Sequence, residues 1–300
     1  MPQLILLTLI VFVGGYFVGA FFYDKAIRAH KEKYREEGLY LFEQERGWIE
    51  GSSSENFYLQ SFDDTFLHAT AVIGHPEKWV IIQHKYRSNG KNMSYIGERY
   101  HKMGFSVLLV DARGHGESQG DYIGMGWHDR LDILTWIHYL SDHYSCRSIL
   151  LCGFSMGAST MIFTGGEELP TNVKGIIADS GYSSIKDVLR HQLSRLYHLP
   201  SFPILRLASF VTRRRAGYSL MRDGDGVKQM KNCRIPVLFI HGEGDVDVPV
   251  SMMEKLYDAG SAPREKLVVE GSSHCMTCWD EPELYWKKVK EFCDKYINIE

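Results

Sequence analysis

Short hydrophobic runs alternate with longer amphipathic segments along most of the chain, from about residue 57 to residue 296. Continuous apolar runs are typical of strands buried in a parallel sheet, and apolar residues on one face at helical spacing are typical of helices that cover it. The predicted strands are residues 57–60, 65–72, 79–82, 106–110, 148–152, 173–178, 236–240 and 266–269. The predicted helices are residues 95–103, 127–144, a segment ending near 164, 252–259 and 284–296. We therefore expect an α/β fold: a mostly parallel, eight-stranded sheet flanked by helices, opened by a hairpin of the first two strands.

One interval, from about residue 184 to residue 235, breaks this alternation. It contains no clear strand pattern, and Leu189, Leu193 and Leu196 lie at helical spacing within it. The interval is too long for an ordinary connection between two strands. We expect a helical insertion over the carboxyl ends of the strands, where it acts as a lid on the substrate pocket. The alternative is an additional helical hairpin packed against the side of the sheet.

The first 23 residues form the strongest change in composition, because residues 4–23 contain no charge and are dominated by Leu, Ile, Val and Phe. A helix of this length can span the hydrocarbon core of a bilayer. We therefore predict a transmembrane anchor over residues 1–23. Basic residues such as Lys25 and Arg28 follow it, which predicts a single-pass protein of the cell membrane with its main domain in the cytoplasm. The alternatives are a cleaved signal peptide and an extracytoplasmic or secreted domain.

The rest of the chain divides into a connector and one folded domain. Residues 24–48 carry charges of both signs and predict a helical connector, which leaves residues 49–300 for the domain and its insertion. A hydrophobic content of 44% is ample for a buried core. The formal net charge of −3 gives no indication of nucleic-acid binding, and we expect none.

The six cysteines do not form a disulfide framework typical of small secreted proteins. Cys275 and Cys278 form a C-x-x-C pair beside His274, a spacing that also occurs in metal and redox sites. No second Cys or His pair at zinc spacing accompanies them. We expect no metal ion, and a metal or redox role of this pair is the alternative.

The clearest chemical signal is the G-x-S-x-G pattern of residues 153–157, which follows a predicted strand and precedes a predicted helix. A nucleophilic serine needs a tight turn that projects its hydroxyl from the end of a sheet, and Gly153 and Gly157 have no Cβ to obstruct that turn. The N–H groups at the start of the following helix favour developing negative charge. We predict Ser155 as a nucleophile; the alternative is a serine in an ordinary glycine-rich turn.

A serine hydroxyl becomes a good nucleophile when a neighbouring histidine takes its proton and a carboxylate orients that histidine. Asp245 follows the strand predicted at 236–240, and His274 follows the strand predicted at 266–269. Along the chain the serine comes first, the acid second and the histidine last, which is the order expected when the three follow strands of a mostly parallel sheet with a G-x-S-x-G turn. Asp247 and Asp179 are the alternative acids, although we expect Asp179 to hold its own loop through backbone N–H groups.

An oxyanion formed by attack on a carbonyl needs two N–H donors. The backbone N–H of Met156, directly after the nucleophile, is the first predicted donor. The second is expected in the loop after the strand at 79–82, where we choose the N–H of Tyr86 from the sequence His84-Lys85-Tyr86.

From about residue 57 to residue 296 the chain resembles the α/β-hydrolase superfamily. It is most similar to membrane-anchored bacterial serine hydrolases that are related to serine aminopeptidases and prolyl-oligopeptidase-like hydrolases. The resemblance supports Asp245 as the acid and Tyr86 as a donor, and implies that Arg113, Gly114 and His115 shape their loop. One position departs from the family pattern, because Lys85 stands where a glycine usually follows the histidine, which is costly if that position needs a positive φ. The matching motifs are residues 111–118 (D-x-R-G-H-G-x-S), 153–157 (G-F-S-M-G), 179–182 (D-S-G-Y), 241–249 (H-G-x-x-D-x-x-V-P) and 271–274.

Together the residues and the resemblance predict a serine hydrolase that cleaves carboxylic esters through an acyl-enzyme. The partner expected is a small-molecule or lipid-derived ester, in addition to the membrane, and no metal or organic cofactor is implied. One alternative is a peptidase like the serine aminopeptidases, in which Asp223 or Asp225 of the insertion could bind a free amino terminus. Another is a catalytically silent binding protein on the same fold.

Overall fold

The computed structural model describes residues 1–30 and 47–297. Most of the connector predicted over residues 24–48 lies outside the described residues. The strands are β1 (Ser54–Gln60), β2 (Phe66–Val72), β3 (His75–Gln83), β4 (Phe105–Val110), β5 (Ser148–Phe154), β6 (Val173–Asp179), β7 (Val237–Gly242) and β8 (Arg264–Val269). The helices are α1 (Pro2–Ala26), α3 (Gly47–Gly51), the 3-10 helix η2 (Gly90–Met93), α4 (Ser94–Lys102), α5 (Asp129–His143), α6 (Met156–Gly165), α7 (Ile185–Tyr197), α8 (Ile204–Arg215), α9 (Gly226–Asn232), α10 (Val250–Ala259), α11 (Thr277–Asp280) and α12 (Pro282–Tyr296).

The strands form one sheet of eight in the order β1-β2-β4-β3-β5-β6-β7-β8. β2 pairs antiparallel with both β1 and β4, and every other pairing is parallel. β5 occupies the middle: Leu151 lies opposite Ile81 of β3 on one side and Ile176 of β6 on the other. The predicted α/β fold and its opening hairpin are confirmed, and the G-x-S-x-G pattern follows the central strand of the sheet.

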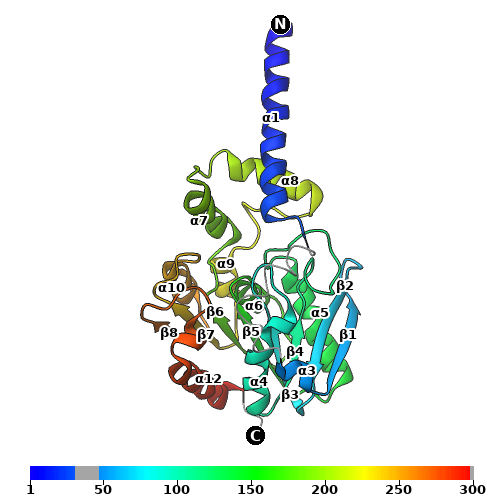
Figure 1. Ribbon diagram of the computed structural model, residues 1–300, viewed down its shortest axis with the longest axis vertical. Helices are drawn as coiled ribbons and strands as arrows, with labels where there is room; N and C mark the ends of the chain where they lie inside the picture. Colours follow the sequence, from blue (N-terminus) through cyan, green and yellow to red (C-terminus); the bar gives the residue numbers. More distant parts are fainter. Residues whose placement is uncertain (31–46, 298–300) are drawn as a thin grey trace.

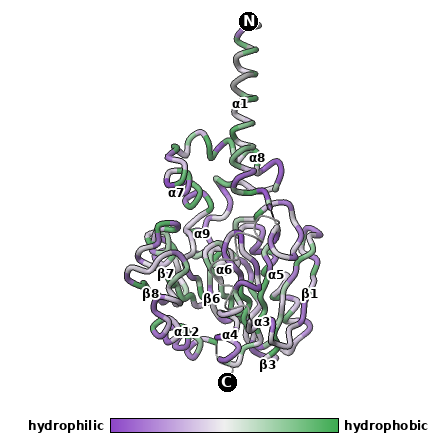
Figure 2. Tube along the Cα trace, in the orientation of Figure 1, coloured by the Kyte–Doolittle hydropathy of each residue, from purple (hydrophilic) through white to green (hydrophobic). Residues whose placement is uncertain are grey.

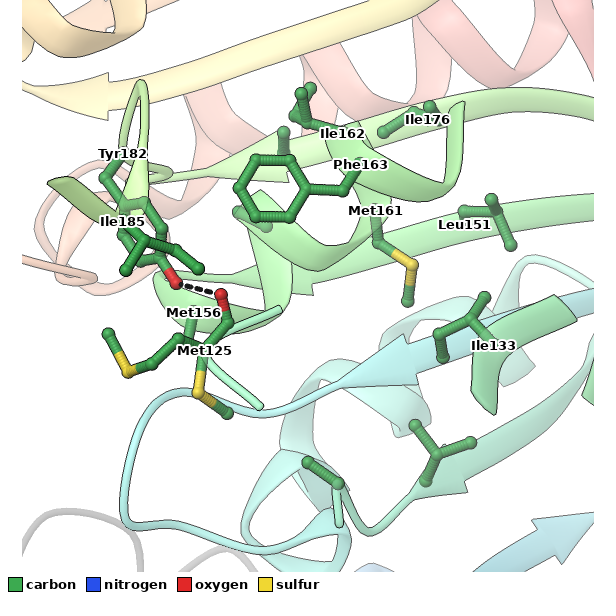
Figure 3. Packing of buried hydrophobic residues seen from close by; sticks show 14 of the residues in the cluster. Met125, Ile133, Leu151, Met156, Met161, Ile162, Phe163, Ile176, Tyr182 and Ile185 are labelled. Atoms are coloured by element: carbon green, nitrogen blue, oxygen red, sulfur yellow. Dashed lines mark hydrogen bonds between the residues drawn. The ribbon is translucent and has the colours of Figure 1, made fainter. Parts of the chain in front are cut away.

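Alternate side chains of the central strands enter two separate hydrophobic cores, as the two-residue period of a strand requires. Leu151 packs with α5 and α6 on one face, whereas Leu150 and Cys152 pack with α4 and α12 on the other. Figure 3 shows part of the first core, where Met161 and Phe163 of α6 lie beside Leu151 and Ile176. Both faces are therefore covered by helices, which explains why the strands are continuous apolar runs.

The interval from residue 184 to residue 235 is helical and consists of α7, α8 and α9. α7 begins at an N-cap, because the Ser184 hydroxyl accepts a hydrogen bond from the Asp187 N–H. In Figure 1, α7 and α8 lie above the end of the sheet, close to the last turns of α1. The interval is thus helical as expected, and its role as a lid insertion stays a prediction.

Most of α1 projects away from the body, and hydrophobic residues recur along it (Figures 1 and 2). Its exposed side chains include Leu9, Phe12 and Phe17, whereas Tyr23 near its end is buried. Among the described residues, no helix combines the length and hydropathy that crossing a membrane requires. The transmembrane anchor predicted over residues 1–23, and with it the single-pass membrane location, is therefore not supported. The last turns of α1 pack against α8 and the body of the protein.

A buried arginine holds the loop after β4, where the resemblance implied a loop-shaping motif. The Arg113 guanidinium is 1% exposed and donates two hydrogen bonds to the Asp132 carboxylate, at 2.8 Å from Nε and 2.6 Å from Nη2. It also donates to Asp63 at 2.8 Å and to the Tyr122 hydroxyl at 2.7 Å. The planar guanidinium thus ties the β1–β2 turn, the β4 loop and α5 together.

We expect Arg113→Met to lower the free energy of unfolding by about 3–5 kcal/mol, because it leaves the Asp132 carboxylate buried without its partner. Urea denaturation at neutral pH measures the change. The matched control is Arg147→Met, since Arg147 is 64% exposed and its nitrogen lies 3.7 Å from Glu77. The control should change stability by less than about 1 kcal/mol. Equal, small effects of both substitutions would contradict the structural role of Arg113.

Candidate active site

Ser155 occupies a sharp turn between β5 and α6. Its backbone has φ 52° and ψ −111°, a conformation that is unfavourable for any residue with a side chain. An added Cβ on Gly153 would lie 2.3 Å from the carbonyl of Gly157, and one on Gly157 would lie 2.2 Å from the carbonyl oxygen of Gln83. Both glycines are therefore required by the close approach of the helix to the sheet. The turn leaves Ser155 7% exposed at the carboxyl end of the central strand.

The structure brings the three predicted side chains together at this edge of the sheet. His274 Nε2 lies 2.8 Å from Ser155 Oγ, and His274 Nδ1 lies 2.6 Å from Asp245 Oδ2. These residues follow β5, β7 and β8, whose carboxyl ends meet at the same edge. The two contacts form a continuous hydrogen-bonded chain from a hydroxyl through an imidazole to a carboxylate.

The environment of Asp245 favours its ionised form. Its Oδ1 accepts backbone N–H groups of Asp247 at 2.9 Å and of Val248 at 2.8 Å. Burial would raise the pKa of Asp245, but hydrogen bonds with His241 and His274 hold that pKa well below its usual range. Burial lowers the pKa of His274, but the neighbouring Cys275 and the hydrogen-bonded Asp245 carboxylate together raise that pKa above the usual histidine value. The pair is therefore arranged to stabilise a proton on the imidazole.

The two alternative acids have other contacts. Asp247 pairs with Arg195 of α7. Asp179 is fully buried, and its carboxylate accepts hydrogen bonds from the Thr277 hydroxyl at 2.8 Å and the Ser180 hydroxyl at 2.9 Å. The Ser180 hydroxyl in turn accepts the N–H of Cys275, next to His274, at 3.2 Å. Asp179 thus supports the histidine loop through hydroxyl groups, whereas we expected backbone N–H groups.

A cavity of about 460 Å³ opens beside Ser155 and His274, a volume in the ordinary range for a small-molecule site. Its walls are mostly apolar. The insertion contributes Val188, Leu189, Leu193, Leu196 and Tyr197 from α7 and Ile204, Leu205 and Ala208 from α8. The insertion therefore forms much of the pocket that the sequence expected it to cover.

Met156 and Tyr86 both line this cavity next to Ser155. Met156 is the first residue of α6, so its N–H has no acceptor within the helix. The N–H of Arg87 in the same loop is bonded to His115 Nε2 at 3.2 Å, and the N–H of Tyr86 as the second oxyanion donor stays a prediction. Lys85 is not among the described residues with positive φ, whereas Arg87 has φ 57°. The backbone therefore accommodates lysine at the position where the family pattern has glycine.

Comparison with known proteins gives the family. Residues 74–203 match the family described as serine aminopeptidase, S33. The protein YqkD of Bacillus subtilis is 30% identical over 216 residues, which cover 72% of this chain and 70% of that protein. The chain belongs to the α/β-hydrolase superfamily. The family assigns it to the hydrolases, as the sequence predicted.

Other relatives of this α/β-hydrolase agree on the fold. An esterase of Pyrococcus furiosus is 25% identical and superimposes with a TM-score of 0.69, covering 82% of this chain and 92% of the esterase. A thermostable monoacylglycerol lipase of a Bacillus species is 20% identical over 273 residues, which cover 80% of this chain and 98% of the lipase. These similarities agree with the eight-stranded sheet and with the match to a hydrolase family.

The α/β-hydrolase also contains site features that the sequence analysis missed. Phe22, Lys25 and Ala26, at the end of α1, line the cavity. The uniform hydrophobicity of α1 carried no signal for this role. Two buried histidines support the Tyr86 loop. His84 Nδ1 donates a hydrogen bond to the Lys85 carbonyl at 2.7 Å, and its Nε2 accepts one from the Ala112 N–H at 3.1 Å. His115 accepts a hydrogen bond from the Arg87 N–H. The position of His84 just after β3 could have indicated from the sequence that this histidine supports the loop.

The C-x-x-C pair of this α/β-hydrolase lies within the second core. Cys275 and Cys278 are both buried free thiols. Within residues 1–30 and 47–297, no group of three or more His, Cys, Asp or Glu side chains is placed to hold a metal ion.

The contact between the Asp245 carboxylate and the His274 imidazole should be visible in the pH titration of His274. NMR titration of the imidazole should give a midpoint above the usual value of about 6.5, because the adjacent carboxylate favours the protonated form below that midpoint. In Asp245→Asn the midpoint should move to lower pH, since the charge of the hydrogen-bonded carboxylate is lost while the burial of the imidazole remains. The His274→Gln spectrum assigns the resonance.

Asp247→Asn is the matched control for this titration, because Asp247 pairs with Arg195. It should leave the His274 midpoint within a few tenths of a pH unit. A midpoint that Asp245→Asn does not move would show that the carboxylate leaves the imidazole unaffected.

Proposed function

We propose that this α/β-hydrolase cleaves carboxylic esters with Ser155 as its nucleophile. The observation that carries the proposal is the hydrogen-bonded chain from Ser155 Oγ through His274 to Asp245, with contacts of 2.8 and 2.6 Å. A free serine hydroxyl is a weak nucleophile, and a histidine held in this way accepts its proton during attack. The family membership supports a hydrolase, and the geometry supports serine chemistry within it.

In the proposed mechanism, Ser155 Oγ forms a bond to the ester carbonyl carbon while His274 Nε2 accepts the hydroxyl proton. Asp245 orients the imidazole and stabilises its positive charge. The backbone N–H groups of Met156 and Tyr86 donate to the oxyanion. The carbon–oxygen bond to the alcohol then breaks, and His274 gives the proton to the leaving alcohol. A water molecule, activated by the same imidazole, hydrolyses the acyl-enzyme and regenerates Ser155.

The cavity favours an ester with an apolar acyl group. Its walls are formed mainly by aliphatic and aromatic side chains of α7 and α8. Burial of each methylene of a substrate in such a pocket contributes about 0.8 kcal/mol. The name of the related monoacylglycerol lipase of a Bacillus species is consistent with this substrate class.

The second candidate function is an aminopeptidase, which the description of the matching family favours. The two acids expected to bind an amino terminus have other roles. Asp223 accepts the Ser219 N–H at 2.7 Å, and Asp225 caps α9 by accepting the Lys228 N–H at 3.1 Å. Neither lines the cavity. We therefore favour esters, and a comparison of p-nitrophenyl esters with aminoacyl p-nitroanilides distinguishes the two functions.

Ser155→Ala should abolish labelling by a fluorophosphonate and lower kcat/KM for p-nitrophenyl butyrate by a factor on the order of 10^6. The physical reason is that no other hydroxyl lies within reach of His274 Nε2 in the described contacts. Gel fluorescence measures the labelling, and absorbance of released p-nitrophenolate measures the rate.

The control for this experiment is Ser273→Ala, because Ser273 is exposed beside His274 and belongs to none of the proposed contacts. It should label and turn over like the unchanged protein. A wild type that neither labels nor hydrolyses any ester would instead favour a silent binding protein on this fold.

A further inference from the structure

The end of the N-terminal helix α1 lies within the candidate site and not merely beside it. Phe22, Lys25 and Ala26 line the same cavity as Ser155 and His274. The Phe22 ring packs edge-on against the ring of Tyr197 at the end of α7, with 5.6 Å between the centroids. The cavity is therefore bounded by α1 on one side and by the insertion on the other.

The last turn of α1 is also bonded to the loop that carries the second proposed oxyanion donor. The hydroxyl of Tyr86 donates to the Ala26 carbonyl at 3.0 Å, and Arg87 Nη2 donates to the Lys25 carbonyl at 2.7 Å. Carbonyl groups in the last turn of a helix have no partner within the helix, so these side chains satisfy two of them. Movement of α1 would thus disturb both the cavity wall and the Tyr86 loop.

The distance between α1 and α8 is set by a glycine. A Cβ added to Gly19 would lie 2.5 Å from the backbone oxygen of Leu207 in α8, closer than real contacts allow. One turn earlier the same surface is looser, because a Cβ on Gly15 would meet only the Leu207 side chain, at 3.3 Å. The Arg215 guanidinium at the end of α8 donates to the Tyr16 hydroxyl at 3.1 Å, across the same two helices. These contacts hold α1 in one position against the insertion.

We propose that the last turns of α1 are a specificity-determining wall of the substrate cavity, and that the Gly19–Leu207 contact sets the position of this wall. The inference rests on the proposed ester hydrolysis and deepens it. The substrate class is an ester whose apolar acyl chain lies between α1 and the helices of the insertion. Phe22 contacts this chain, and α1 thereby decides which chain lengths are accepted.

The first test compares two glycines of the same helix in the 300-residue chain. Gly14→Ala and Gly19→Ala gain the same helix propensity, but a Cβ on Gly14 has no neighbour within 4 Å whereas one on Gly19 collides with α8. We expect Gly19→Ala to lower the kcat/KM ratio of p-nitrophenyl laurate to p-nitrophenyl acetate about tenfold, because a displaced wall loses its contact with the long chain. Gly14→Ala should keep the ratio of the wild type.

The second test compares two neighbouring phenylalanines and does not depend on the folding of Gly19→Ala. Phe22 lines the cavity, whereas Phe21 is half exposed and does not. Phe22→Ala should likewise lower the preference for long-chain esters across a series from acetate to palmitate, because it removes the ring that contacts the acyl chain. Phe21→Ala should leave the series unchanged.

Fluorophosphonate labelling separates failure of this inference from failure of the proposed function. Variants that still label at Ser155 but differ from the wild type in chain-length preference as described support the inference, whatever their absolute rate with acetate. Variants of Gly19 and Phe22 with the chain-length profile of the wild type overturn it while leaving the esterase intact. A wild type without labelling or ester hydrolysis overturns the proposed function itself.

Discussion

The close approach of α6 to the end of β3 is the constraint on which the candidate site depends. Gly157 faces the Gln83 carbonyl so closely that even a Cβ would lie 2.2 Å away, and Gly153 meets Gly157 in the same way. This contact forces Ser155 into a conformation with φ 52°, and directs its hydroxyl out of the sheet toward His274. The strain is held by packing on both sides, since β5 is the central strand and every residue of α6 is buried. A rigid turn of this kind pre-organises the hydroxyl and the helix N-terminus before any substrate binds.

Buried polar groups then hold the loops that complete the site. His84 and His115 fix the loop of Tyr86, Asp179 supports the loop of His274, and the Asp245 carboxylate is itself held by two backbone N–H groups. Each of these groups is a buried donor or acceptor with a hydrogen-bond partner. Burying such a pair costs little folding free energy, whereas removing one partner leaves the other group buried without a hydrogen bond and lowers stability. The loops contain the residues of the candidate site, and the buried groups beneath them determine where the loops lie.

The cavity beside Ser155 and His274 has a different origin, because most of its lining comes from segments outside the sheet. α7 and α8 provide most of its apolar surface, and α1, which is distant in the sequence, closes it through Phe22 and Ala26. The hydrogen bonds from Tyr86 and Arg87 to the end of α1 connect this wall with the reacting centre. In the proposed mechanism, substrate recognition by α1 and stabilisation of the oxyanion therefore meet at the loop of Tyr86.

Local spacing in the chain was enough to predict the fold and the candidate residues, because buried parallel strands are continuous apolar runs and a nucleophile turn needs glycines on both sides of Ser155. The resemblance to the family, in which Val248-Pro249 follow the acid at the usual distance, supported the preference for Asp245 over Asp179. The tertiary structure alone decided the distances among the three side chains, the use of hydroxyls around Asp179, and the place of α1. An apolar run in the sequence does not show which element it will contact, so the packing of the last turns of α1 on α8 could not be predicted from it. Such contacts join residues that are about 200 positions apart, as Tyr16 and Arg215 are, and no local pattern records them.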